Sequence, residues 1–180
     1  MAYKYSRGER ELGDIEYEGD PGTGIDFEDD YISMQTGGNN ILVVSGSLVG
    51  VGTASPKTTI AIAGSVSANV TNINNGSNNA STYNIGSSEY AIFCNTRPAA
   101  QGGIDSALTI NLPSAASYPG RILIFKDAGG YSGTNAITIQ RAGSDKINGN
   151  ATSITLPSTA GGAAMQMMSD GSGQWFEIGN

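Results

Sequence analysis

The feature that most constrains the fold of this chain is the octet Val-Gly-Val-Gly-Thr-Ala-Ser-Pro at residues 49–56. Glycine at alternate positions gives an extended backbone that can pack very closely against its neighbours, because no Cβ intervenes. Pro56 excludes a helix and pushes the residue before it toward extended geometry. A β-rich run precedes the octet and an alternating run, Thr-Ile-Ala-Ile-Ala-Gly-Ser-Val, follows it at 59–66. The octet therefore predicts a thin β stalk in which Gly50, Gly52 and Pro56 allow chains to approach closely.

The composition predicts an all-β protein with many turns. The 180 residues include 26 Gly and no His, and only 14% are charged. Apolar residues fall in short runs rich in Ile, Val and Thr, whereas Gly, Asn and Ser occupy the stretches between them. No window of eleven or more residues shows a clean helical period, so we expect almost no helix. Gly129 and Gly162 are expected in surface turns that tolerate a side chain.

All of the net charge lies at the N-terminal end. Residues 1–30 hold ten acids and three bases, a net of −7, whereas residues 31–180 hold six of each. We interpret residues 1–35 as an acidic attachment arm that is extended alone and becomes ordered on a partner with basic groups. Tyr3, Tyr5, Phe27 and Tyr31 are its predicted anchors, and nucleic acid is disfavoured because phosphates would be repelled. The alternative is a disordered solubilising tail.

The remainder divides into three predicted segments. Residues 36–70 form the stalk, residues 71–88 an Asn/Ser-rich linker, and residues 89–180 a globular head. Short alternating strands at regular spacing predict that the head is a β-sandwich of jelly-roll type. The head strands are expected at 90–96, 107–112, 122–126, 136–141, 146–148, 153–156, 164–169 and 174–178, and the stalk strands at 40–45 and 59–63.

Two parts of the sequence resemble bacteriophage tail-fibre and virion spike proteins. The octet with its flanks is similar to the Val-Gly-Ile-Gly-Thr-x-x-Pro stalk motif of such fibres. The segment Asn-Leu-Pro-Ser-Ala-Ala-Ser-Tyr-Pro-Gly-Arg-Ile-Leu-Ile-Phe-Lys-Asp-Ala-Gly-Gly at 111–130 looks like part of the C-terminal heads of phage and marine-virus fibres. The ending Met-Ser-Asp-Gly-Ser-Gly-Gln-Trp-Phe-Glu-Ile at 168–178 looks like their closing hairpin. Together these similarities cover about residues 40–180.

The resemblance implies a homotrimeric fibre or spike on a virus particle, on the tail or the capsid exterior. Many proteins with this motif end in a self-cleaving chaperone domain that uses a Ser and a Lys, and no such region follows the head here. We therefore expect the stalk and head to drive trimer assembly. The N-terminus lacks an apolar signal region and no run of about 18 apolar residues occurs, so we expect synthesis in the host cytoplasm without membrane insertion.

Enzymatic chemistry and cofactors are not expected. The chain has no His to act as a base, and its one cysteine, Cys94, suits a small buried hydrophobic residue. The carboxylates of residues 28–30 lack the alternating spacing of a calcium loop, so docking to a basic surface is the favoured interpretation and no metal is expected. We therefore expect a non-enzymatic structural protein that binds itself and other virion proteins.

Alternatives from other classes stay open. The protein could decorate the capsid as a cement protein without binding a receptor. It could also be a carbohydrate-binding module that contacts a host surface glycan through Tyr118, Tyr131 and Trp175, although Trp175 also suits a core or interface position. A glycan-degrading tailspike is disfavoured, because a glycosidase needs a carboxylate pair and residues 36–180 hold only six acids.

Overall fold

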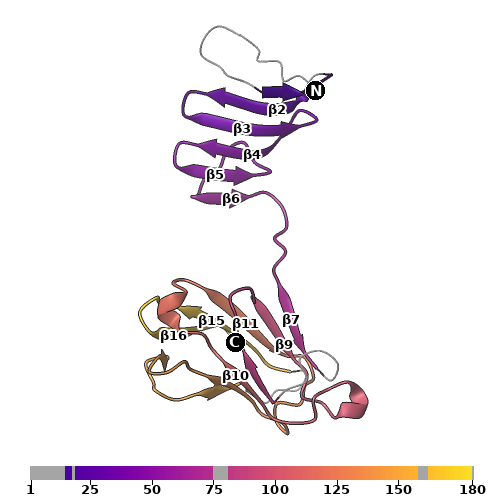
Figure 1. Cartoon of the computed structure of the whole chain (residues 1–180), viewed down its shortest axis with the longest axis vertical. Helices are drawn as coiled ribbons and strands as arrows, with labels where there is room; N and C mark the ends of the chain where they lie inside the picture. The colour runs from indigo at the N-terminus through magenta and orange to yellow at the C-terminus, as the bar shows by residue number, and fades with distance from the viewer. Residues whose placement is uncertain (1–14, 18, 75–80, 158–161, 180) are drawn as a thin grey trace. The chain divides into compact units, whose positions relative to one another are not determined.

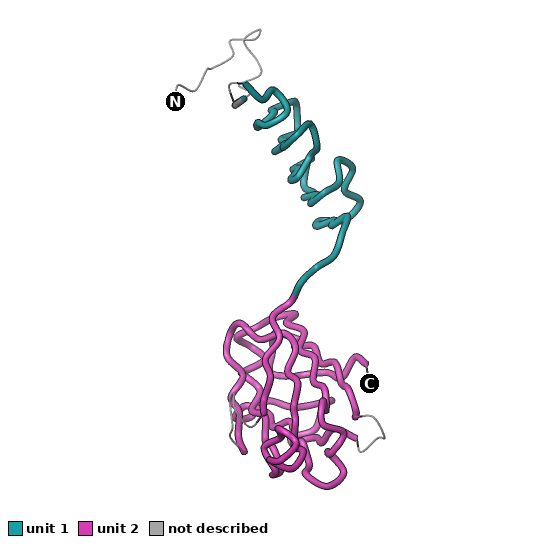
Figure 2. Tube along the Cα trace, turned by 90° about the vertical axis from the view of Figure 1, so that its right-hand side faces the viewer, with its two compact units in different colours: residues 1–67 teal, residues 68–180 magenta. Residues whose placement is uncertain are grey.

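The computed structural model describes residues 15–17, 19–74, 81–157 and 162–179 (Figure 1). The described residues form strands, turns and two short 3₁₀ segments, η1 (Ala99–Gln101) and η2 (Ala115–Ser117), which confirms the all-β prediction. The chain divides into two compact units, Met1–Ser67 and Ala68–Asn180 (Figure 2). We call these the N-terminal unit and the C-terminal unit and describe each by itself.

The N-terminal unit is a single six-stranded sheet whose strands follow one another in chain order (Figure 1). Neighbouring strands pair antiparallel from β1 to β5, and β5 pairs with β6 in parallel. Gly46 lies in a tight turn between two of these strands. Its φ of 56° is a backbone conformation that glycine adopts more readily than other residues. The strands are β1 (Ile15–Tyr17), β2 (Asp20–Glu28), β3 (Tyr31–Thr36), β4 (Asn39–Ser45), β5 (Leu48–Val51) and β6 (Ile60–Ile62).

The described part of the predicted arm differs from an isolated extended segment. Strand β2 lies within residues 1–35, and β3 extends one residue beyond them. Strand β3 pairs with β4 along its length. The reason is visible in the sequence, because Ile25 and Phe27, and again Ile32 and Met34, alternate with polar residues as half-buried strands require. No structural boundary therefore falls at residue 35.

The C-terminal unit consists of two sheets. The first has six strands in the order β13-β16-β15-β11-β9-β7, and the second has four in the order β14-β12-β10-β8. The strands of the first sheet are β7 (Val70–Ile73), β9 (Ala91–Cys94), β11 (Ile122–Asp127), β13 (Lys146–Ile147), β15 (Ala164–Ser169) and β16 (Gln174–Gly179). Those of the second are β8 (Thr82–Asn84), β10 (Leu108–Asn111), β12 (Ile137–Gln140) and β14 (Ile154–Thr155).

The predicted jelly-roll topology is wrong. From β7 to β14 the chain passes from one sheet to the other at every strand, and β7, β9 and β11 pair in parallel, as do β8, β10 and β12. A jelly roll is built from antiparallel strands, whereas here each strand from β8 to β11 is the crossover that joins two parallel neighbours of the other sheet. Strands β7 and β8 also occupy the ends of the predicted linker, which differs from an unstructured connection.

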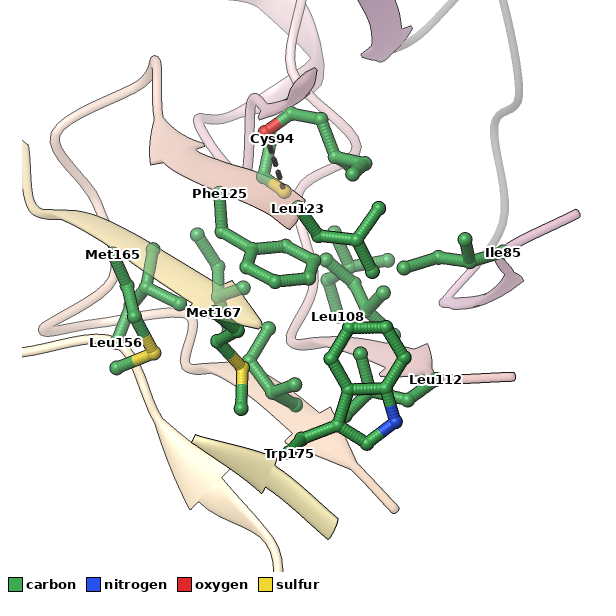
Figure 3. Close-up of a cluster of buried hydrophobic side chains, with 14 of the residues drawn as sticks. Ile85, Cys94, Leu108, Leu112, Leu123, Phe125, Leu156, Met165, Met167 and Trp175 are labelled. Carbon is green, nitrogen blue, oxygen red and sulfur yellow. Dashed lines mark hydrogen bonds between the residues drawn. The ribbon is translucent and has the colours of Figure 1, made fainter. Parts of the chain in front are cut away.

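A continuous hydrophobic core joins the two sheets (Figure 3). Alternate residues of each strand point into it, such as Leu123 and Phe125 of β11 and Ile137 and Ile139 of β12, all fully buried. Trp175 fills one end of the core, and its indole N–H donates to the carbonyl oxygen of Pro113 at 3.2 Å. The C-terminal unit therefore has a buried apolar core of its own and is a β-sandwich in the general sense of two packed sheets.

Candidate functional site

The octet forms strand β5 and the connection that carries the chain back to pair with β6 in parallel. Gly50 is buried, and a Cβ there would overlap the carbonyl oxygen of Thr53 and lie 3.5 Å from the ring Cδ of Pro56. Pro56 is buried as well. The connection thus folds over the strand that it leaves, and Gly50 supplies the space for it.

Gly52 begins this connection with a φ of 68°, in the left-handed region that favours glycine. A Cβ at Gly52 would lie 3.0 Å from the carbonyl oxygen of Ala63. The sequence predicted close approach at Gly50, Gly52 and Pro56 between separate chains. The contacts at Gly50 and Gly52 lie within one chain. The close approach between chains stays a prediction.

The N-terminal sheet has one face made of apolar side chains, which we call the N-terminal apolar face. Cross-strand pairs place its members in two adjacent rows that run from strand to strand. One row is Ile15, Ile25, Met34, Leu42, Val51 and Ile62, and the other is Phe27, Ile32, Val44, Val49 and Ile60.

Much of this face is accessible in the single chain. Ile60 is 64% exposed, Ile62 46% and Met34 44%, and Ile15, Ile32, Val44 and Val51 are exposed as well. Among the described residues of the N-terminal unit, Val43 is the one fully buried large hydrophobic side chain, and it lies on the opposite face. Single soluble chains rarely expose contiguous apolar patches larger than a few hundred Å².

The opposite face of the sheet has a different character. The carboxylates Glu16, Asp26 and Glu28 project from it, since each alternates with apolar-face residues along its strand. Val43 pairs across the ladder with Gly50, beneath the folded-back connection. The sheet is therefore amphipathic, and its acidic groups stay off the apolar face.

The predicted arm anchors are only partly described. Tyr3 and Tyr5 lie outside the described residues. Phe27 and Tyr31 line one shallow hollow of about 370 Å³ beside the β2–β3 turn, together with Glu28, Asp30, Ile32, Val44 and Gly46. The Tyr31 hydroxyl accepts a hydrogen bond from the Asn40 amide at 3.2 Å. Phe27 and Tyr31 thus lie in the folded sheet, and their predicted anchoring role stays a prediction.

The predicted host-contact residues do not form one site. Trp175 is fully buried, so its assignment to a host-contact surface is wrong; its flat ring fills the core between the two sheets (Figure 3). Tyr118 is half-buried under the guanidinium of Arg121, whose Cζ is 4.7 Å from the ring centroid. Tyr131 belongs to a loop whose backbone N–H groups bind the buried carboxylate of Asp127.

A polar cluster that the sequence did not reveal surrounds Glu89. The Tyr83 hydroxyl donates to its carboxylate at 2.8 Å, and Arg121 Nη2 lies 3.9 Å from the other carboxylate oxygen. Burial opposes ionisation of Glu89, but the Tyr83 hydrogen bond, backbone N–H groups and Arg121 together hold its pKa below the ordinary value of 4.5. Arg121 also donates to the carbonyl oxygens of Gly86 and Glu89. These contacts tie the β8–β9 connection to β11.

The one cysteine of the chain lies in the core. Burial, reinforced by Asp127, raises the pKa of the Cys94 thiol to about 12, so Cys94 is a buried apolar residue as expected and holds no thiolate at neutral pH. Within the described ranges no group of three or more His, Cys, Asp or Glu residues is placed to hold a metal ion. No helix in the described part of the chain is long and apolar enough to cross a membrane.

Comparison with known proteins adds no relative to this description. No protein-family model matches the chain, and no curated protein matches it.

Proposed function

We propose that this chain is a non-enzymatic structural protein of a virus particle, a short fibre or spike assembled from three copies. The observation that carries self-assembly is the N-terminal apolar face, whose rows of Ile, Val and Met side chains stay exposed in one chain. A one-layer sheet gains little apolar burial to offset its chain entropy while its apolar face is exposed to water. A partner surface that covers this face stabilises the sheet.

Three copies around one axis suit this sheet. Each would turn its apolar face inward and its carboxylate-bearing face outward, where Glu16, Asp26 and Glu28 remain hydrated. The number three itself comes from the resemblance of residues 49–56 to fibre stalks, since the apolar face by itself requires only self-association.

Residues 1–35 are the proposed attachment segment. Three chains, each with a net of −7 in residues 1–30, bring −21 to the N-terminal ends, enough to steer docking onto a basic platform. The C-terminal unit is then the proposed outward-facing head that contacts the host surface. The alternative of a capsid decoration protein without receptor binding also fits this arrangement. A carbohydrate-binding module is less well supported, because burial of Trp175 removes its strongest stacking residue.

Sedimentation equilibrium tests self-assembly through the apolar face. We expect about three times the 18.4 kDa chain mass at micromolar concentration. Ile32→Lys places a charge on the apolar face and should shift the mass toward a single chain. Gln35→Lys adds the same charge on the opposite side of β3 and should leave the mass unchanged. A wild-type monomer, or equal masses for both variants, would contradict the proposal.

Incorporation into virus particles tests the attachment role. Removing residues 1–35 would also remove β2 and most of β3, so the sharper variant lacks only residues 1–14. We expect this variant to stay trimeric and to be lost from purified particles, because the removed segment carries the predicted anchors Tyr3 and Tyr5. Its three acids and three bases cancel, so the net charge of −7 in residues 15–30 is kept. Normal occupancy of the shortened chain in particles would place attachment elsewhere.

A further inference from the structure

The six-stranded sheet of the C-terminal unit carries large apolar side chains on both sides, with Asn72 and Gln166 among the outward residues. Its inward residues form the core, whereas alternation sends a second set of large apolar side chains outward. Ile122 pairs with Met168, and Met168 pairs with Phe176, so the outward residues of three adjacent strands are contiguous. We call this surface the outer apolar face; its residues are Val70, Phe93, Ile122, Ile124, Met168, Phe176 and Ile178.

The exposure of this face is considerable in the single chain. Ile178 is 50% exposed, Val70 45%, Phe176 40% and Met168 37%. The two acids of these strands, Asp127 and Glu177, lie on the inward side, since they alternate with outward residues. The outward charges of the sheet are two lysines, Lys126 on β11 and Lys146 on the edge strand β13.

The other sheet of the same unit has the opposite character. Its outward side carries a row of threonines, Thr82, Thr109, Thr138 and Thr155, that pair across four strands. A second row consists of the amides Asn84, Asn111 and Gln140, and the Asn111 amide donates to the Asn84 side chain at 2.7 Å. The outward side of the four-stranded sheet is thus polar and suited to contact with solvent, whereas the outer apolar face is not.

We infer that the outer apolar face is a second contact surface between copies of this chain, beyond the N-terminal apolar face. The inference rests on the proposed self-assembly and extends it to the C-terminal unit. In an assembly of identical chains the face would be covered by another copy, and the threonine and amide rows would remain in solvent.

Area supports a second copy as the occupant. Five strands about 4.8 Å apart and four to six residues long span about 400 Å² of sheet. A stable specific interface buries about 800 Å² per partner, so this face alone is small for an independent encounter. The N-terminal sheet offers an apolar face of similar extent in the same chain, and two surfaces in one oligomer reach the required area together.

Charge supports the same occupant. Residues 31–180 hold six acids and six bases, so two C-terminal units do not repel one another. A lipid surface would call for a rim of basic and indole side chains around the apolar face. The only tryptophan of the chain, Trp175, lies inside the core instead, and the face has two lysines.

The methionines of the chain provide the test, through their oxidation by hydrogen peroxide followed by peptide mass spectrometry. Met168 reports on the outer apolar face and Met34 on the N-terminal apolar face, whereas Met165 and Met167 are core residues, at most 3% exposed. In the assembled full-length protein we expect Met168 to oxidise at least tenfold more slowly than in the urea-unfolded chain, close to the rate of Met167. Its 37% exposure in a single chain would give no such protection.

The outcomes separate this inference from the proposed function. Protection of Met34 with free oxidation of Met168 overturns the second surface and leaves the first intact. Protection of Met168 with free oxidation of Met34 supports the second surface and counts against the first. Free oxidation of both residues overturns both assignments.

A pair of variants gives an independent measurement. Phe176→Lys charges the outer apolar face and should lower the association constant of the full chain at least tenfold. Thr138→Lys adds the same charge on the polar side of the other sheet and should leave association unchanged. Equal association constants for the two variants would overturn the inference. Emission from Trp175 checks that each variant keeps its folded core.

Discussion

At the scale of single residues, Gly50 decides how the chain leaves β5 and returns as β6. The eight residues between these strands form a short connection for a parallel pair, which usually needs a dozen residues or more. The connection is short because Thr53 and Pro56 lie directly over Gly50, where any side chain would collide with the backbone. The octet therefore allows the chain to leave β5 and to pair with it again, in parallel, after a short connection.

Replacing Gly50 by Ala should destabilise the protein by about 2 kcal/mol, because backbone must move to admit the Cβ. The matched control is Gly179→Ala in β16, where the new Cβ would meet only the Gln166 side chain at 3.7 Å and the cost should stay within about 0.5 kcal/mol. Urea unfolding followed by far-ultraviolet circular dichroism measures both. The connection does not press on Gly50 if Gly50→Ala shifts the midpoint of the N-terminal unit from its wild-type value no more than Gly179→Ala shifts that of the C-terminal unit.

Other glycines show the limit of sequence reasoning at this scale. Gly129 and Gly162 were predicted to lie in permissive surface turns, and that prediction is wrong. A Cβ on Gly129 would lie 2.9 Å from Asn95 Oδ1, and one on Gly162, where φ is 82°, would overlap the Asp127 carbonyl oxygen. Composition indicates where a turn occurs, but the crowding of a turn depends on residues that are distant in the sequence.

At the scale of elements, the positions of most strands follow from the sequence. Each of the eight strands expected in residues 89–180 overlaps an observed strand, and so do the two expected in the stalk. Alternation of apolar and polar residues, bounded by Gly, Asn and Pro, carries this information. The same pattern correctly placed Cys94 in the core, as the last residue of β9.

Strand pairing does not follow from the same pattern. Apolar residues at every second position show which face of a strand is buried. They do not show which other strand lies beside it. Regular spacing suggested the antiparallel hairpins of a jelly roll. The strands from β7 to β14 instead alternate between the two sheets, and from β7 to β12 each pairs in parallel with the next but one. The N-terminal apolar face was missed for a related reason, because it appears only once the registers of six strands are known.

Strands β2, β3, β7 and β8 were missed because composition masked their pattern. In β2 and β3 the acidic residues favoured an arm over a strand, although Ile25, Phe27, Ile32 and Met34 alternate as a strand requires. In β7 and β8 the surrounding Asn and Ser residues favoured a linker. Packing against neighbouring strands outweighs intrinsic propensity in such short segments.

At the scale of the whole molecule, the two units differ in how they bury apolar surface. The C-terminal unit has a continuous core that includes Phe125, Ile139, Met167 and Trp175, all fully buried. The N-terminal unit has Val43 beneath its connection, and its larger apolar face is open in the single chain. The stability of the N-terminal unit should therefore depend on association, whereas that of the C-terminal unit should depend mainly on its own core.

This difference predicts two unfolding transitions with unequal dependence on protein concentration. For a trimer that unfolds as it dissociates, a 100-fold dilution lowers stability by about 1.8 kcal/mol per chain. We expect that shift in the transition of the N-terminal sheet. The rate of Met34 oxidation monitors this transition, and Met34 is 44% exposed in the single chain. Emission from Trp175 follows the C-terminal core, and its transition should shift less because the core holds without a partner.

Ile32→Lys should abolish the concentration dependence of the first transition, whereas Gln35→Lys should keep it. A transition of the N-terminal sheet that does not move on dilution would show that this sheet does not rely on other copies for its stability.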